Sequence, residues 1–321
     1  MAQKRSKNAR KILILGSSGM LAADLIKVFR EKEKYKITAW DRDDLDITNE
    51  EAVNKKISKL KPDIIINAAA YTAVDKCETE FDKALLINGY ALRFLSESAL
   101  KIGAILVHYS TDYVFNGENS KGYKEDDEPN PVSSYGQSKF VGEQMILLAE
   151  ANNYGGCGGC ALSRGKCAKA ASKIKPFKYY LIRTSWLYGH NGKNFVDTMI
   201  SLGQSRGLGT ELKVVNDQFG KPTYTLDLAK KTREIIEKNL PFGAYHFTNE
   251  TGKKGISWYD FAREFFKIKK IKVKVKPVTT KEFYGADKTR LAKRPKYSML
   301  VNTKLPRARD WKKALKDYLL S

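Results

Sequence analysis

Residues 11–22 read KILILGSSGMLA, and this stretch decides the fold class. The apolar run that ends at Leu15 is typical of a buried parallel strand. Gly16 and Gly19 then allow a tight turn into a helix, and Ala22 is small enough for that helix to pack closely on the strand. Such a turn can bring backbone N–H groups against a pyrophosphate. A plain strand-to-helix turn is the alternative, so the rest of the chain must decide.

Strands and helices alternate after this turn. Further strands are expected at 35–40, 64–67, 104–109 and 179–183, with helices at 49–60, 80–102 and 133–150. Beyond residue 186 the alternation is less regular, with strands expected at 212–215, 244–247 and 270–278 and a helix at 257–266. We therefore predict an α/β fold, in which a Rossmann-type doubly wound parallel sheet carries a smaller C-terminal α/β substrate lobe.

A tyrosine and a lysine lie four residues apart in the stretch SSYGQSK, residues 133–139. Tyr135 and Lys139 share one face of the expected helix. We expect the ammonium to lower the pKa of the phenol, which would make the tyrosine a proton donor near neutral pH. Such a pair is often only a solvated helix face. Here the glycine turn precedes it, and Thr111 and Asp112 end an apolar strand between the two motifs, which favours a catalytic pair.

The second expected strand ends at Asp41-Arg42, 25 residues after Gly16. A carboxylate at this place can bond the ribose of an adenosine. The guanidinium beside it can pair with a 2′-phosphate. The two residues favour opposite cofactors, so NADH and NADPH both remain open. An acidic loop end with no ligand is the alternative for this stretch.

Other candidate residues carry weaker signals. Three small residues follow Asn67 after the third expected strand and would let a cofactor lie against the backbone. His108, His190 and His246 show no spacing typical of metal ligands. His108 and His246 lie inside strand-like runs, so we expect them to be packed in the core.

Residues 151–176 interrupt the α/β pattern with GGCGGC followed by a Lys/Ala-rich run. This stretch has little apolar surface to offset the entropy of ordering it, so we expect a mobile surface insertion that chemistry does not need. Cys157, Cys160 and Cys167 resemble part of a metal knuckle. A zinc site takes four ligands and the remaining cysteine, Cys77, is 80 residues before Cys157, so we expect no metal.

The formal net charge is +22, and the excess is local. Residues 251–321 hold 21 Lys or Arg against six Asp or Glu, and residues 1–11 and 151–178 are basic with no acid. A basic face can bind nucleic acid, an anionic membrane or a polyanionic substrate, or it can be a solvated surface. The chain contains no recognisable nucleic-acid module, no apolar run of ~18 residues and no apolar signal-peptide core. We expect a cytoplasmic protein without nucleic-acid or membrane partners.

With these motifs in order, the chain resembles the extended short-chain dehydrogenase/reductases, and among them the dTDP-4-dehydrorhamnose reductase family. The likeness covers about 11–150 and 177–320. It is carried by residues 67–76 (NAAAYTAVDK), 110–115 (STDYVF), 135–139 (YGQSK), 183–189 (RTSWLYG), 194–199 (NFVDTM), 217–223 (DQFGKPT) and 294–298 (RPKYS).

The resemblance implies hydride transfer from NADPH or NADH to C4 of a nucleotide-sugar, dTDP-4-dehydro-β-L-rhamnose. Tyr135 would protonate the C4 oxyanion, Lys139 would hold the nicotinamide ribose, and Thr111 would bond the substrate oxygen. Asp112 and Trp186 would contact the sugar nucleotide. With the two motifs above, the expected cofactor contacts are Gly16, Gly19, Met20, Leu21, Asp41, Arg42, Asp46, Ile47, Ala70, Tyr71, Thr72, Tyr109, Tyr135 and Lys139.

We place the NAD(P)-binding domain at 11–185, and a nucleotide-sugar lobe at 186–321 that partly returns to it. The resemblance leaves a homodimer open. A reductase of a different 4-keto sugar is the closest alternative. A relative of this family is a non-catalytic, NADP-binding regulatory subunit of methionine adenosyltransferase. That alternative is disfavoured because Thr111, Tyr135 and Lys139 are all present.

Overall fold

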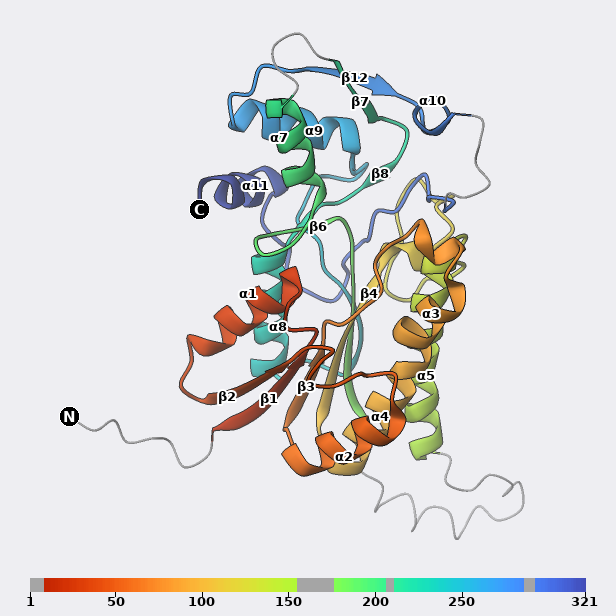
Figure 1. Cartoon of the computed structure of the whole chain (residues 1–321), viewed down its shortest axis with the longest axis vertical. Coiled ribbons are helices and arrows are strands. Elements are labelled where there is room, and N and C mark those ends of the chain that lie inside the picture. Colours follow the sequence, from red (N-terminus) through yellow and green to blue (C-terminus); the bar gives the residue numbers. More distant parts are fainter. Residues whose placement is uncertain (1–8, 155–175, 206–210, 286–291) are drawn as a thin grey trace, which may run out of the picture.

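A computed structural model describes residues 9–154, 176–205, 211–285 and 292–321. Its centre is a parallel β-sheet (Figure 1). The sheet has six strands in the order β10-β5-β4-β3-β1-β2. The order reverses between β1 and β3, and ligands of doubly wound sheets bind outside the carboxyl ends at such a point. The six strands are β1 (Arg10–Leu15), β2 (Tyr35–Trp40), β3 (Ile64–Asn67), β4 (Ile105–Thr111), β5 (Lys178–Thr184) and β10 (Gly243–His246).

Helices cover both faces of this sheet and bury two separate apolar cores. One core joins the sheet to α1 (Met20–Arg30) and α8 (Thr225–Glu237). The other joins it to α2 (Glu50–Leu60), α4 (Ala91–Ile102) and α5 (Ser134–Tyr154). Asn49 caps α2 because its side chain accepts a hydrogen bond from Ala52 N at 2.9 Å. The predicted doubly wound sheet is therefore confirmed.

The helix expected at 80–102 is confirmed, but a π-helical turn divides it into two α-helices. A short α3 (Phe81–Leu85) is followed by a π-helical turn, η2 (Leu86–Tyr90), before α4 begins. Asn88 in this turn accepts from Tyr71 N at 2.8 Å and donates to Tyr71 O at 2.9 Å and Ser138 Oγ at 3.0 Å. A Cβ on Gly142 of α5 would lie 2.2 Å from Asn88 O. The π turn therefore joins the loop after β3 to α5.

The smaller lobe stands beyond the carboxyl ends of the central strands (Figure 1). It contains α7 (Phe195–Ser205), α9 (Trp258–Ile268), α10 (Thr280–Tyr284), α11 (Trp311–Leu320) and a parallel pair of β7 (Glu211–Val215) and β12 (Lys274–Val278). Two-residue strands make the remaining pairs, β6 (Leu187–Tyr188) with β9 (Thr223–Tyr224), and β8 (Phe219–Gly220) with β11 (Ile256–Ser257). The lobe has its own core, rich in aromatic rings.

The chain enters the lobe after β5, returns to the sheet through α8 and β10, and then builds the rest of the lobe. The division into domains at 11–185 and 186–321 stays a prediction. The helix α5 runs to Tyr154, so the start of the expected insertion 151–176 is the last turn of that helix. Its cysteine-containing part lies outside the described residues, and none of the described helices is both long and apolar enough to span a bilayer.

Candidate active site

A cavity of about 530 Å³ lies between β1 and β3, where the strand order reverses. It is formed by the loops that follow β1, β2 and β3. Eight of the predicted cofactor residues line it: Gly16, Gly19, Asp41, Arg42, Asp46, Ile47, Ala70 and Tyr71. The sequence reasoning missed Ser18, Leu45, Thr48, Lys83, Leu86 and Ile87 as site residues, although these also line the cavity. Ala68 and Ala69, noted only as small residues, complete the wall.

Gly16 fixes the floor of this cavity. Its φ is +74°, a conformation that residues with a Cβ rarely adopt. A Cβ there would also lie 2.7 Å from Ala69 N. The glycine turn therefore rests directly on the backbone after β3. Ser18 and Gly19, just before α1, line the cavity, and a pyrophosphate could bind at that helix N-terminus.

Asp41 and Arg42 stand at the adenosine end. Hydrogen bonds from Ser18 and from Arg42 N lower the pKa of Asp41, so its carboxylate is charged and can accept from a ribose hydroxyl. The Arg42 side chain is 78% exposed and its Nε is 3.8 Å from Asp46 Oδ2. An exposed ion pair of this length holds a guanidinium only weakly, so Arg42 can turn to an added phosphate.

Lys83 is a second cation at this cavity. Its Nζ donates to Glu80 Oε2 at 2.8 Å and lies 4.7 Å from the centre of the Tyr71 ring. In the sequence, Glu80 and Lys83 read as an ordinary i, i+3 pair on a helix surface. The sequence carries no signal that would have placed Lys83 at the cavity, because its place there depends on how α3 packs in the fold.

Thr111, Asp112 and Tyr135 meet at the carboxyl end of β4. Tyr135 is in the first turn of α5, which begins where Ser134 N and Oγ donate to the Glu78 carboxylate at 3.0 and 2.6 Å. Burial, and then the charge of Asp112, raise the pKa of Tyr135, while a hydrogen bond with Thr111 opposes the rise. Lys139 is not among the groups that shift this pKa, so the expected lowering of the pKa by Lys139 is wrong.

Lys139 is 2% exposed and is turned toward β4. Its Nζ donates to Tyr109 O at 2.7 Å and lies 3.0 Å from His108 Nε2. Burial lowers the pKa of Lys139 to about 7, and the carboxylate of Glu143 opposes that shift. Tyr135 and Lys139 lie on one helix, as expected. The lysine side chain points to β4 because the Tyr109 carbonyl and the His108 ring lie within its reach there.

Asp112 is a buried carboxyl group, 2% exposed, beside the phenol. Its Oδ1 accepts from Thr111 Oγ1 at 3.0 Å. Its Oδ2 has no partner within hydrogen-bond distance among the described residues, although the Ser298 hydroxyl lies near enough to lower the pKa of Asp112. Burial raises the pKa of Asp112 to about 7. Because an unpaired buried oxygen is costly, a hydroxyl of a bound sugar is a fitting partner for it.

Several predicted residues turn their side chains away from the cavity. The Tyr109 hydroxyl lies 2.8 Å from Thr232 Oγ1 in the core, because alternation along β4 points this residue to α8. Leu21 is also buried in that core, Thr72 is exposed, and Met20 Sδ accepts from Asn194 Nδ2 of the lobe at 3.9 Å. These residues can meet a cofactor through their backbone.

Trp186 belongs to the aromatic cluster of the lobe. Its φ is +48°, and its ring stacks on Trp258 with centroids 3.5 Å apart and planes at 10°. A Cβ on Gly220 would lie 2.5 Å from the Trp186 ring, so that ring also rests on backbone. Trp186 is thus fixed where β5 passes into the lobe, and its contact with a sugar nucleotide stays a prediction.

The C-terminal segment closes over the loop after β3. Arg294 donates to both carboxylate oxygens of Asp75 at 2.9 and 2.8 Å and lies 5.2 Å from the centre of the Tyr284 ring. Lys296 O accepts from Phe219 N at 2.7 Å. The motif at 294–298, which only the resemblance had singled out, therefore connects the lobe to the nucleotide-binding half.

Among the described residues, no group of three or more His, Cys, Asp or Glu side chains is arranged so that it could bind a metal ion. Cys77 is buried, and burial raises the pKa of its thiol to about 11. Cys157, Cys160 and Cys167 lie outside the described residues.

The comparisons with known proteins agree with this geometry. The family model of the RmlD substrate binding domain matches residues 10–154 and 166–321, so only 155–165 interrupt the match. A dTDP-4-dehydrorhamnose reductase from Clostridium acetobutylicum is 42% identical, with a TM-score of 0.81 over 96% of this chain and 98% of that one. The enzyme of that name from Bacillus anthracis, solved with NADP, is 36% identical, with a TM-score of 0.81 over 97% and 99%.

Some curated relatives carry other names. The spore coat polysaccharide biosynthesis protein SpsK of Bacillus subtilis is 37% identical over 96% of both chains. The chain belongs to the RmlD family, the NADP-binding 4-keto nucleotide-sugar reductases of the extended short-chain dehydrogenase/reductases.

Proposed function

We propose that this protein reduces the C4 ketone of dTDP-4-dehydro-β-L-rhamnose to dTDP-β-L-rhamnose, with NADPH or NADH as the reductant. The observation that carries the proposal is the meeting of Thr111, Asp112 and Tyr135 at the end of β4, with a dinucleotide-sized cavity at the neighbouring switch point. The relatives of that name, which align with nearly the whole chain, support the choice of sugar.

The bound nicotinamide would supply the hydride to C4. Tyr135 would then give its phenolic proton to the C4 oxyanion, so that hydride and proton together yield the alcohol. Burial raises the pKa of Tyr135 and keeps the phenol protonated until the sugar binds, so the ammonium of Lys139 would have to lower that pKa for the proton to be given up. The Thr111 hydroxyl, which donates to Asp112 Oδ1 in the structure, would turn to donate its one proton to the developing oxyanion.

Asp112 would fix the sugar. The Oδ2 of Asp112 can accept a hydrogen bond from a sugar hydroxyl. Burial raises the pKa of Asp112 to about 7, so the carboxyl group is only partly ionised near neutral pH. Lys139 would turn from β4 to the nicotinamide ribose, where its ammonium stabilises the phenolate left after proton transfer.

The direct test follows nicotinamide absorbance with dTDP-4-dehydrorhamnose and a panel of other 4-keto nucleotide-sugars. We expect the rhamnose precursor to give the highest kcat/KM. A higher value with another sugar would favour the second candidate, a reductase of a different 4-keto nucleotide-sugar, which the equally similar SpsK makes reasonable. NADP binding without turnover of any sugar would favour a non-catalytic regulatory subunit.

Replacing Arg42 by Ala should weaken NADPH binding about tenfold or more and leave NADH binding nearly unchanged. The reason is that a guanidinium–phosphate hydrogen bond contributes roughly 1.5–3 kcal/mol, and only NADPH carries the 2′-phosphate. Dissociation constants of both cofactors, measured by titration of the purified protein, check this. Arg93, an exposed arginine paired with Glu97 on α4, provides the control Arg93→Ala. Equal losses with both cofactors would mean that Arg42 does not bind that phosphate.

A further inference from the structure

His108 is a buried histidine that the proposed reaction does not use. It lies within β4, is 1% exposed, and sits between two polar side chains. On one side its Nδ1 is 3.2 Å from Asn67 Nδ2, since Asn67 is its partner across the β3–β4 register. On the other side its Nε2 is 3.0 Å from Lys139 Nζ. The imidazole therefore connects the end of β3 to the lysine of the site.

The hydrogen bonds around Asn67 determine which nitrogen of His108 carries the proton. Asn67 Oδ1 accepts from Ala69 N at 3.1 Å, which fixes the amide with its Nδ2 toward the ring. An amide nitrogen can only donate, so the Asn67 side chain requires His108 Nδ1 to accept and favours a neutral ring with its proton on Nε2. Burial lowers the pKa of His108, and a hydrogen bond with the Asn67 backbone opposes that shift. The Nε2–H points at Lys139 Nζ. An ammonium has no lone pair, so the contact is a hydrogen bond only when Lys139 is an amine.

The other ionisable groups near Lys139 are compatible with an uncharged lysine amine. The carboxylate of Glu143, one turn along α5, favours the ammonium, but Arg183 of β5 engages it through Nε at 3.0 Å and Nη2 at 2.7 Å. Tyr135, one turn earlier, is a neutral phenol because burial raises its pKa. From β4, the Tyr109 carbonyl accepts one lysine proton in either charge state.

We propose that His108 is a positioning residue for Lys139, whose Nε2–H holds the lysine against β4 as an amine in the cofactor-free protein. When the lysine leaves this contact for the ribose of a bound cofactor, it takes one proton from solvent and becomes an ammonium. Cofactor binding is thereby coupled to proton uptake. The role of the lysine at the ribose rests on the proposed function, but the proton uptake can be measured without any sugar.

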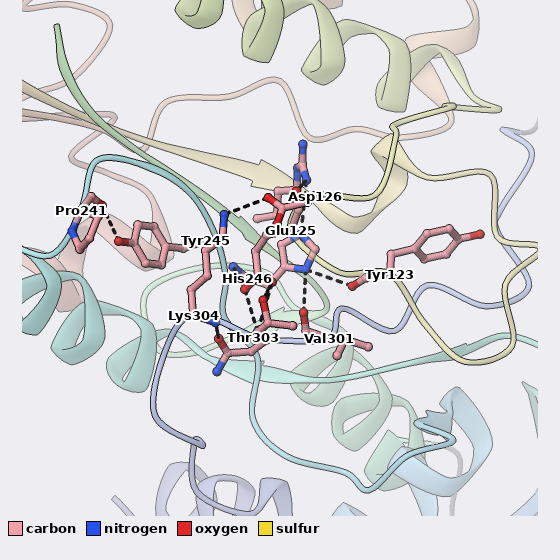
Figure 2. Close-up of polar contacts among 11 residues, drawn as sticks. Tyr123, Glu125, Asp126, Pro241, Tyr245, His246, Val301, Thr303 and Lys304 are labelled. Carbon is pink, nitrogen blue, oxygen red and sulfur yellow. Dashed lines mark hydrogen bonds and ion pairs between the residues drawn. The ribbon is translucent and has the colours of Figure 1, made fainter. Parts of the chain in front are cut away.

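The tautomer can be tested on the unmodified protein by ¹⁵N NMR of its three histidines. We expect the two buried rings to be neutral and of opposite tautomers. His246 Nδ1 lies 3.1 Å from Tyr123 O and 3.2 Å from Val301 O, so it must carry a proton there (Figure 2). His108 should carry its proton on Nε2 and lose that signal in His108→Gln. If both buried rings are protonated on Nδ1, the proposal is wrong.

Calorimetry in buffers of different ionisation enthalpy measures the coupled proton. At pH 8, where the phosphates of NADPH are fully ionised, the unmodified protein should take up roughly one proton on binding NADPH. Lys139→Met should abolish the uptake. His108→Gln should reduce it, because the amide oxygen of Gln accepts from an ammonium and lets Lys139 be charged beforehand.

His246→Gln is the matched control, since it removes the other buried imidazole without touching Lys139. It should keep the uptake of the unmodified protein. No uptake in the unmodified protein, or equal uptake in His108→Gln, would overturn the proposal. If His108→Gln does not fold, the NMR spectrum, the uptake of the unmodified protein and Lys139→Met still decide it. Loss of sugar turnover with normal uptake would count against the proposed function alone.

Discussion

Tyr135→Phe is expected to lower kcat by about 10²–10⁴-fold, the usual contribution of a general acid, while NADPH binding stays near normal. Phe keeps the ring, which meets Tyr113 edge to face at 5.7 Å between centroids, so the local packing survives. It removes only the hydroxyl, which lies close enough to Thr111 and Asp112 for both to shift its pKa. Steady-state kinetics with the sugar and titration of the cofactor measure the two quantities separately.

Tyr180→Phe is the matched control for this experiment. Tyr180 is also a buried tyrosine, but it lies in β5 and its hydroxyl donates to Leu240 O at 2.8 Å, far from the proposed proton transfer. We expect its kcat to stay within a few-fold of the unmodified protein. Near-normal turnover in Tyr135→Phe would remove that tyrosine from the mechanism.

Arg183→Leu is expected to lower the free energy of unfolding by about 3–5 kcal/mol, because it leaves a buried carboxylate without its partner. Arg183 binds Glu143 through Nε at 3.0 Å and Nη2 at 2.7 Å, and both side chains are buried. Its Nη1 also donates to Glu125 O at 3.1 Å. Chemical denaturation monitored by circular dichroism measures the loss.

The surrounding hydrogen bonds explain why this loss should be large. Glu125 accepts from Thr303 N and Oγ1 and from His246 N, and thereby fastens the C-terminal segment to β10 (Figure 2). The double variant Arg183→Leu/Glu143→Leu should recover part of the stability, since no buried charge is then unpaired. The exposed pair Arg93–Glu97 offers the control Arg93→Leu, and a loss no larger than in that control would contradict the prediction.

The central sheet could be predicted because its strands carry a local signal. Runs such as 11–15 and 64–67 are apolar without interruption, as strands covered on both faces are, and they stand between amphipathic helices. The π turn at Leu86–Tyr90 could not be predicted, since it depends on the contacts of Asn88 with Tyr71 and Ser138. The two-residue strands of the lobe are too short to show a period.

Sequence motifs predicted which loops form the site, but they did not predict in which direction the side chains point. Asp41 and Gly16 are fixed by the local strand-turn-helix chemistry and line the cavity as expected. Lys139 was expected to act on Tyr135 because of their i, i+4 spacing. Instead it turns to His108 and Tyr109, because β4 places a carbonyl and an imidazole within its reach. Burial, which dominates the pKa of both Tyr135 and Lys139, is a property of the packed chain.

The return of the chain to the central sheet limits how this protein can be divided. A fragment ending at residue 185 would lack β10, which pairs with β5 along residues 243–246, and would expose β5 as a free edge. It would also lack α8, whose Leu228 and Ile235 are buried against the sheet. Free edges and bare apolar faces promote aggregation. A chimera that takes the sugar lobe of a relative must therefore exchange two separate segments, about 186–222 and 248–321, and keep the native residues between them.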